Sequence, residues 1–212
     1  MKLGVPPRFR PALAGALAVL GLEFFLAVAA VLQYLRADQD WVTAPLSFYL
    51  MGPHSAWLIA AYFALALSIA LVGWGLYMDL SPPVRHRPTL WLFGIAALCV
   101  CTVALAHTDL PGAAHLSPEG MLHNTAAILA FAASGLGMLL QAWWLRYDTR
   151  WRMRHRKAFL LAAVTFAALC AYVLFPGLPR GVSQKFVILL IVLWLLMSAR
   201  WLTLTWTREA ET

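Results

Sequence analysis

The residues best suited to chemistry gather around one short connection of the chain. His107 and Asp109 close one apolar segment, and Glu119 and His123 open the next. Glu119 and His123 are four residues apart, so they share one face of the helix that they begin. An imidazole near a helix N-terminus tends to stay neutral, and a neutral imidazole can bind a metal or accept a proton. This group is therefore the first candidate site.

Two interpretations of this group stay open. The nitrogen and oxygen atoms of His107, Asp109, Glu119 and His123 suit Zn²⁺ with an open position for water, an arrangement that would favour hydrolysis at the membrane surface. The chain contains no His-Glu-x-x-His motif, however. Ser117 is a good N-cap, followed by Pro118 at the first helical position. The favoured interpretation is that buried hydrogen bonds of these side chains tie two helix ends together.

A second candidate is Glu23, near the middle of the first apolar segment. An acidic side chain at that depth is costly, usually faces a bundle interior and often marks function. We expect no Lys or Arg at its depth, so a protonated Glu23 should bond to a hydroxyl group of another segment. The hydroxyls at comparable depth belong to Ser68, Thr102, Ser134 and Thr165. A structural role and a polar pocket are equally favoured.

The elements that position these residues follow from composition. Of the 212 residues, 62% are hydrophobic and 12% charged, whereas ordinary globular chains carry about 25% charged residues. The apolar residues form blocks about as long as the ~20 residues that cross a bilayer. Because a lipid-exposed backbone must satisfy its own hydrogen bonds, and no alternating pattern suggests a barrel, each block predicts a helix.

The prediction is an all-α membrane protein with a single domain over residues 1–212 and six transmembrane helices. Their ranges are 11–35, 55–78, 89–106, 120–145, 158–175 and 185–206. The three cysteines lie inside these apolar blocks, where a cysteine behaves as a small hydrophobe. Prolines and glycines mark the connections, none of which is long enough for a separate domain.

The basic residues predict the orientation. Thirteen of the 16 Lys and Arg residues fall at the termini or in alternate connections, as Lys2, Arg8, Arg10, Arg85, Arg87, Arg146, Arg150, Arg152, Arg154, Arg156, Lys157, Arg200 and Arg208. The other three are Arg36, Arg180 and Lys185. Because cytoplasmic connections retain positive charge, both termini are predicted to be cytoplasmic. The net charge of +7 then has a topological meaning, so no nucleic-acid partner is predicted, and the partners expected are membrane lipids.

Several short motifs resemble a known family. They are Leu46-Ser47, Gly52-Pro53, Thr108-Asp109 and the helix start Gly120-Met121-Leu122-His123. Together they resemble domain of unknown function 998, a family of bacterial and archaeal multi-pass membrane proteins, over about residues 46–201. The resemblance implies a six-helix fold and a location in the cytoplasmic membrane of a bacterium or archaeon. It points to Ser47, Asp109 and His123 as the residues to watch, without an established reaction.

One element departs from the family pattern. Where the family tends to open its last span with Gly-x-x-Glu-Arg, this chain has Gly181-Val182-Ser183-Gln184-Lys185, which keeps the positive charge and loses the carboxylate. The Ser/Asp/His set is also similar to the zinc ligands of the alkaline-ceramidase and adiponectin-receptor superfamily. That family has seven spans and a His-x-x-x-His pair that this chain lacks, so the likeness is an analogy only.

Three functional hypotheses follow. The leading one is a polar pocket on the non-cytoplasmic side that binds a lipid or small amphipathic molecule, lined by Ser47, His54, His107, Asp109, Glu119 and His123, with Glu23, Gln184 and Lys185 as further candidates. Asp109 and His123 would provide recognition or acid/base chemistry, and Ser47 a hydrogen bond. The alternatives are a zinc-dependent membrane hydrolase and a non-catalytic accessory subunit of a membrane complex. The sequence does not decide whether the chain is an enzyme.

Overall fold

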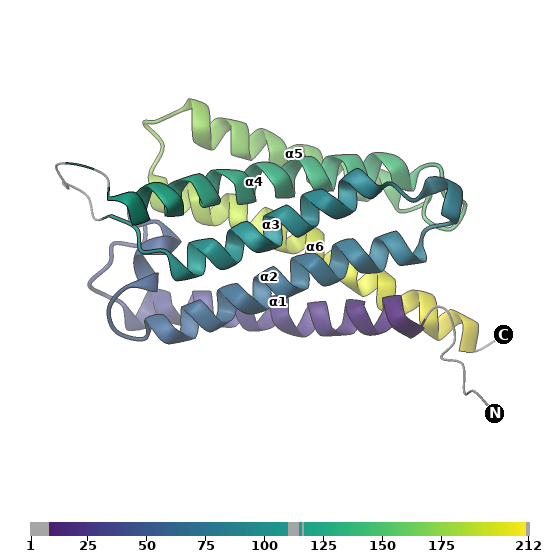
Figure 1. The fold of residues 1–212 in the computed structure, drawn as a ribbon, viewed down its shortest axis with the longest axis horizontal. Coiled ribbons are helices and arrows are strands. Elements are labelled where there is room, and N and C mark those ends of the chain that lie inside the picture. The colour runs from purple at the N-terminus through teal and green to yellow at the C-terminus, as the bar shows by residue number, and fades with distance from the viewer. Residues whose placement is uncertain (1–8, 110–114, 116, 211–212) are drawn as a thin grey trace.

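The computed structural model describes residues 9–109, 115 and 117–210, which form six long helices and two short 3₁₀ helices (Figure 1). Each long helix is long and apolar enough to cross a membrane. The described residues contain no strand. The elements are α1 (Phe9–Leu35), η1 (Leu46–Leu50), α2 (Ser55–Asp79), η2 (Pro82–Val84), α3 (Arg87–Leu105), α4 (Pro118–Leu145), α5 (His155–Leu174) and α6 (Arg180–Ala210).

The six predicted membrane helices are thus confirmed, with ends that differ by a few residues. The largest difference at a helix start is in α6, which begins at Arg180 rather than at residue 185. Its first turn packs on the connection between α1 and α2, where the Val182 N–H donates to the Val42 carbonyl at 3.0 Å. This tertiary contact extends the helix into a stretch whose nearby proline and glycine suggested a loop.

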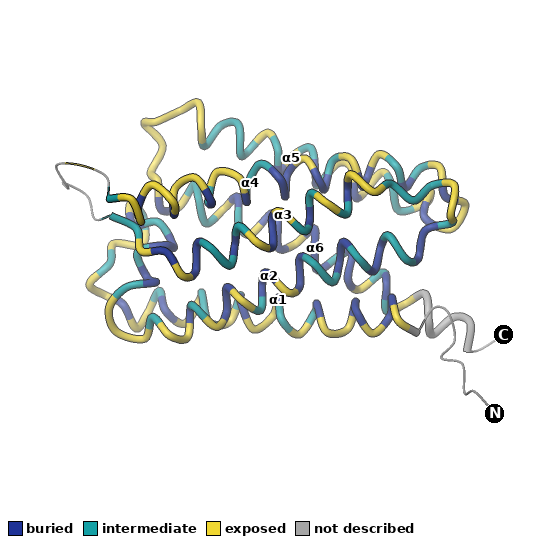
Figure 2. Tube along the Cα trace, in the orientation of Figure 1, coloured by how far each residue is buried: buried dark blue, intermediate teal, exposed yellow. Residues whose placement is uncertain are grey.

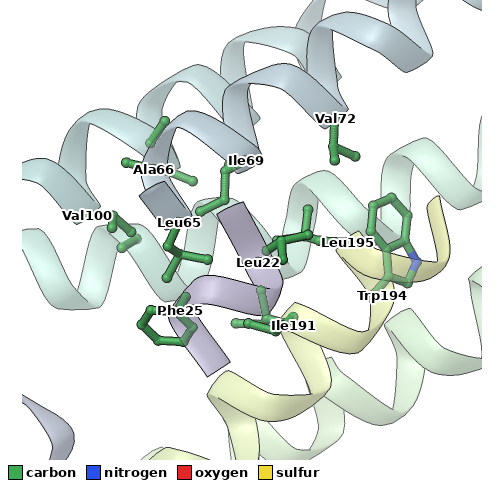
Figure 3. Packing of buried hydrophobic residues seen from close by; sticks show 14 of the residues in the cluster. Leu22, Phe25, Leu65, Ala66, Ile69, Val72, Val100, Ile191, Trp194 and Leu195 are labelled. Atoms are coloured by element: carbon green, nitrogen blue, oxygen red, sulfur yellow. The ribbon is translucent and has the colours of Figure 1, made fainter. Parts of the chain in front are cut away.

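The helices form a closed bundle in which each packs on the next and α6 returns to α1 (Figure 1). α6 also contacts α2 and α4, whereas α5 is the least buried helix. Alanines on the inner faces bring the helices close together, as small residues do in membrane bundles; Ala18, Ala61, Ala96 and Ala199 are fully buried. Large apolar side chains fill the centre of the bundle, and Figure 3 shows Phe25, Leu65 and Ile191 among them.

The two ends of the bundle differ in chemistry. We call the end that holds the α2–α3 and α4–α5 connections the arginine end, and α1 begins and α6 ends there (Figure 1). The opposite end, which holds the α1–α2, α3–α4 and α5–α6 connections, is the histidine end. Which end faces the cytoplasm stays a prediction from the basic residues.

Buried polar residues from distant parts of the chain meet at the arginine end. The Asp148 Oδ2 atom accepts hydrogen bonds from the Ser81 N–H at 2.9 Å and the Ser81 hydroxyl at 2.7 Å. The Trp151 indole donates to Asp79 at 2.8 Å, and Arg150 lies beside both carboxylates. We call Asp79, Ser81, Asp148, Arg150 and Trp151 the arginine-end network. It joins the end of α2 to the α4–α5 connection and so sets where α5 starts.

Candidate functional site

A narrow cavity of about 70 Å³ lies inside the histidine-end half of the bundle. Apolar side chains from α1, α2, α3, α4 and α6 form most of its wall, and the lining residues that carry polar groups are Ser47, Tyr62, His123, Ser134 and Gln184. Its lining on α4 extends from His123 to Ser134, which lies 11 positions further along the helix, or about 16.5 Å at 1.5 Å per residue. Figure 3 shows Phe25, Leu65, Ile69 and Val100 of its wall near the bundle centre. The cavity is therefore an apolar slot with a polar end.

His123 has a fixed orientation at this polar end. Its side chain is 3% exposed, and its Nδ1 atom lies 2.8 Å from the Ala106 carbonyl oxygen at the end of α3. Because a carbonyl oxygen only accepts, Nδ1 carries the hydrogen, and in the neutral ring Nε2 keeps a lone pair. Nε2 has no hydrogen-bond partner among the described residues. His123 thus offers the cavity a hydrogen-bond acceptor.

Gln184 and Ser47 complete the polar end. The Gln184 Oε1 atom accepts the Leu46 N–H at 2.9 Å, so the amide NH₂ group is left to donate. Ser47 belongs to η1 and is buried, and its hydroxyl has no partner within the part of the chain that the structure describes. These two side chains and His123 together present a donor, a hydroxyl and an acceptor.

The α1–α2 connection is held firmly over this polar end. Arg36 is buried, pairs with Asp38 at 2.8 Å and donates to the Met51 carbonyl at 2.5 Å. The hydrogen bonds and charge of Arg36 hold the pKa of Asp38 well below its usual range. At the other side, a Cβ atom on Gly181 would lie 2.6 Å from the Ala44 carbonyl oxygen, so only glycine permits this approach. The sequence indicated Arg36 for topology alone and missed this positioning role.

Asp109 lies outside the cavity lining and positions the helix that carries His123. Its carboxylate accepts the Ser117 N–H at 2.8 Å, and the Ser117 hydroxyl in turn accepts the Gly120 N–H at 2.9 Å. A Cβ atom at Gly120 would overlap the Asp109 carboxylate at 2.0 Å. The glycine of the Gly-x-x-His helix start therefore makes room for Asp109, three residues before the histidine that faces the cavity.

His107 and Glu119 form a separate, exposed pair. The Glu119 Oε1 atom accepts from the His107 backbone N–H at 2.8 Å and from its Nδ1 at 2.6 Å. The pair ties the end of α3 to the start of α4, as expected, but it is exposed to solvent rather than buried. His123 points instead to Ala106, so the four suggested zinc ligands do not converge. Among the described residues, no group of three or more His, Cys, Asp or Glu side chains is arranged to hold a metal.

Three further candidates also lie away from the cavity lining. His54 caps α2 in a left-handed conformation and faces a groove between α1 and α2. Lys185 donates to the Trp41 carbonyl at 2.8 Å. Glu23 pairs with Arg200 at 3.3 Å on the outer surface.

The expectation that no cation reaches Glu23 is therefore wrong. α6 runs obliquely across α1 (Figure 1), and its tilt together with the length of an arginine side chain brings Arg200 to Glu23. Of the hydroxyls suggested as partners, those of Ser68, Thr102 and Thr165 each donate to a carbonyl of their own helix. Ser134 faces the cavity.

Comparison with known proteins identifies the family of this chain. The family described as "Protein of unknown function (DUF998)" matches residues 19–201 of the chain. The chain belongs to this family. Among curated proteins and solved structures, none shows significant similarity to it.

The DUF998 match covers the whole candidate site. Every cavity-lining residue, from Phe25 to Val192, lies inside the matched range. Of the three residues that the resemblance pointed to, Ser47 and His123 line the cavity, and Asp109 supports the start of α4. In this DUF998 protein, Gln184 occupies the position of the glutamate in the Gly-x-x-Glu-Arg pattern, and it lines the cavity.

Proposed function

We propose that this membrane protein binds a single-chain amphiphile, with its alkyl chain in the apolar slot and an uncharged polar head against Ser47, His123 and Gln184. The observation that carries the proposal is the union of an apolar slot with three unpaired hydrogen-bonding groups at one end. A buried polar group without a partner costs free energy, which a ligand head would recover.

The size of the slot supports a narrow ligand. Its volume of about 70 Å³ is roughly half that of a cavity that encloses benzene. As it stands, the slot holds only a few carbon atoms, so one alkyl chain along its length requires the wall side chains to move apart, and two chains or a ring system would require a larger movement. The head should carry both a hydroxyl, to donate to His123 Nε2, and an oxygen acceptor for the Gln184 amide. A monoacylglycerol has this chemistry.

Native mass spectrometry of delipidated protein titrated with a medium-chain monoacylglycerol tests the proposal. His123→Ala should weaken binding about tenfold, the effect of losing one hydrogen bond to a buried ligand head. The matched control is His107→Ala, which removes an exposed histidine outside the cavity lining. Ala130→Leu, which fills the slot, should also weaken binding without touching the polar end. Wild-type protein that binds no amphiphile, or equal binding by all variants, would contradict the proposal.

The proposal places the polar end of the slot on the non-cytoplasmic side of the membrane. Single cysteines test this orientation after the three native cysteines, which lie within α3 and α5, are replaced by alanine. In intact cells, a membrane-impermeant maleimide should label Ala37→Cys at the histidine end and should leave Met153→Cys at the arginine end unlabelled. Both positions are exposed. The reverse pattern would place the polar end of the slot in the cytoplasm.

The alternatives carry less support. A zinc-dependent hydrolase lacks a converging ligand set among the described residues, and no contact in the molecule favours an accessory subunit over a ligand-binding protein.

A further inference from the structure

The wall of the cavity is sealed on three sides and thinner on the fourth. The lining residues from α1, η1, α2 and α3 are all buried. The partly exposed lining residues are Ala127 and Phe131 of α4 and Gln184 and Ile188 of α6. The thin side therefore lies where α4 faces α6.

α5 contacts both of these helices, but it is most closely packed toward the arginine end, and its residues from Phe166 to Tyr172 are at most partly buried. Its buried residues are Ala158, Ala162 and Thr165, none of them beyond the middle of the helix. Just beyond them, Phe166 and Leu169 lie against Gly135 of α4. From Val173 onward the chain is exposed up to Arg180. Figure 1 shows this end of α5 standing away from α4, and Figure 2 shows its exposure.

We infer that the cavity opens sideways to the lipid between α4 and α6, beneath the histidine-end half of α5. This inference rests on the proposed function and names the route of the ligand. No α5 residue lines the cavity, so the four partly exposed side chains close the gap between α4 and α6 from within, and Tyr172 of α5 lies outside them beside Phe131. We call these residues, Ala127, Phe131, Gln184 and Ile188, the lateral portal.

The chemistry of the portal fits an amphiphile that arrives from the membrane. Ala127, Phe131 and Ile188 are apolar, so an alkyl chain passes from lipid to slot without meeting water. Gln184 stands at the polar end of the same gap, where the head would travel. Tyr172 of α5 lies beside Phe131, with 6.4 Å between the ring centroids. Arg180 donates a hydrogen bond to the backbone carbonyl of Tyr172 at 3.0 Å. This contact holds the last turn of α5 at the edge of the portal.

η1 makes a route from the aqueous side less direct. Four of its five residues are buried, among them Ser47 and Tyr49, and its first N–H is bound by Gln184. A head group that arrived from water would have to displace this short helix. The lateral route requires only side-chain movement in the portal.

Exchange kinetics test the portal. Protein in phosphatidylcholine vesicles is mixed with vesicles that carry a fluorescent medium-chain monoacylglycerol, and the association and dissociation rates are followed by stopped flow. Ala127→Trp and Ile188→Trp, which narrow the portal, should slow both rates on the order of tenfold, as a blocked gate does. Ile188→Ala, which widens it, should speed both. The control Leu189→Trp changes the neighbouring residue, whose side chain is exposed outside the cavity lining, and should leave the rates unchanged.

The outcomes separate the portal from the proposed function. Ligand that binds wild-type protein but exchanges at the same rate in all three portal variants would overturn the portal and leave the proposed function standing. Slower association combined with faster dissociation in the tryptophan variants would also contradict the portal, because it indicates a damaged site. Wild-type protein that binds no amphiphile would overturn the proposed function and the portal with it.

Discussion

The carboxylates of the arginine-end network and the polar side chains at the polar end of the cavity differ in how they are paired. At the arginine end, Asp148 accepts three hydrogen bonds and Asp79 accepts one from the buried Trp151 indole. At the histidine end, Ser47 and His123 are equally hidden from solvent, yet each keeps an unpaired group beside the cavity. A polar network whose groups bond to one another stabilises the fold, whereas unpaired groups in a cavity wall suit a ligand. The comparison separates residues that hold the bundle together from residues that the proposed function assigns to the ligand.

The largest expected effect is on stability at the arginine end. Asp148→Ala would remove a buried carboxylate, leave the partly buried Ser81 N–H and hydroxyl without their acceptor, and should lower the free energy of unfolding by about 3 kcal/mol. Ser47→Ala, which removes a buried hydroxyl that bonds to no described residue, should leave the free energy of unfolding unchanged or raise it slightly. Denaturation in mixed detergent micelles measures both. Equal losses for the two variants would erase the distinction between the ends.

Acid should weaken the arginine end through the same carboxylate. Burial alone would raise the pKa of Asp148, but the hydrogen bonds from Ser81 and the nearby Arg150 outweigh it and lower the pKa. A carboxyl group with a lowered pKa in the folded state stabilises the protein fully above its unfolded pKa of about 3.9, and this stabilisation is lost as the pH falls further.

The matched variant for this prediction is Asp148→Asn, which keeps an oxygen acceptor but cannot ionise. The difference in melting temperature between wild type and this variant should be constant at neutral pH and should shrink below about pH 4. Because Asp38 at the histidine end also has a lowered pKa, only the difference isolates Asp148. A difference that does not change with pH would show that the charge of Asp148 contributes nothing.

The sequence predicted the fold better than the site for a physical reason. A bilayer imposes the length, apolarity and helical form of each span, and these properties are local in the chain. The roles of Ser47 and His123 were partly visible, since both belong to short motifs near helix ends. The arginine-end network was not, because Asp79 and Asp148 belong to distant parts of the chain and only packing brings them together.

Glu23 and Asp109 failed as cavity residues for a similar reason. The sequence placed Glu23 near the middle of the first span and Asp109 at the end of the third. It did not show in which direction either side chain points. Because α6 is tilted, Glu23 pairs with Arg200. Asp109 instead accepts a hydrogen bond from the Ser117 N–H at the start of α4. Depth is a local property of the sequence, whereas direction depends on tertiary structure.

The smallest expected effect sharpens the comparison within the histidine end itself. Glu119→Gln would weaken the pair with His107, whose two side chains are exposed to solvent. Exposed ion pairs contribute little because water screens them and the long side chains lose freedom. The variant should therefore have the same free energy of unfolding as wild-type protein and bind the monoacylglycerol equally well. In contrast, His123→Ala, four residues along the same helix, should bind it about tenfold more weakly. Loss of ligand in Glu119→Gln with unchanged stability would extend the binding site to the helix-tying pair and contradict its separation from the cavity.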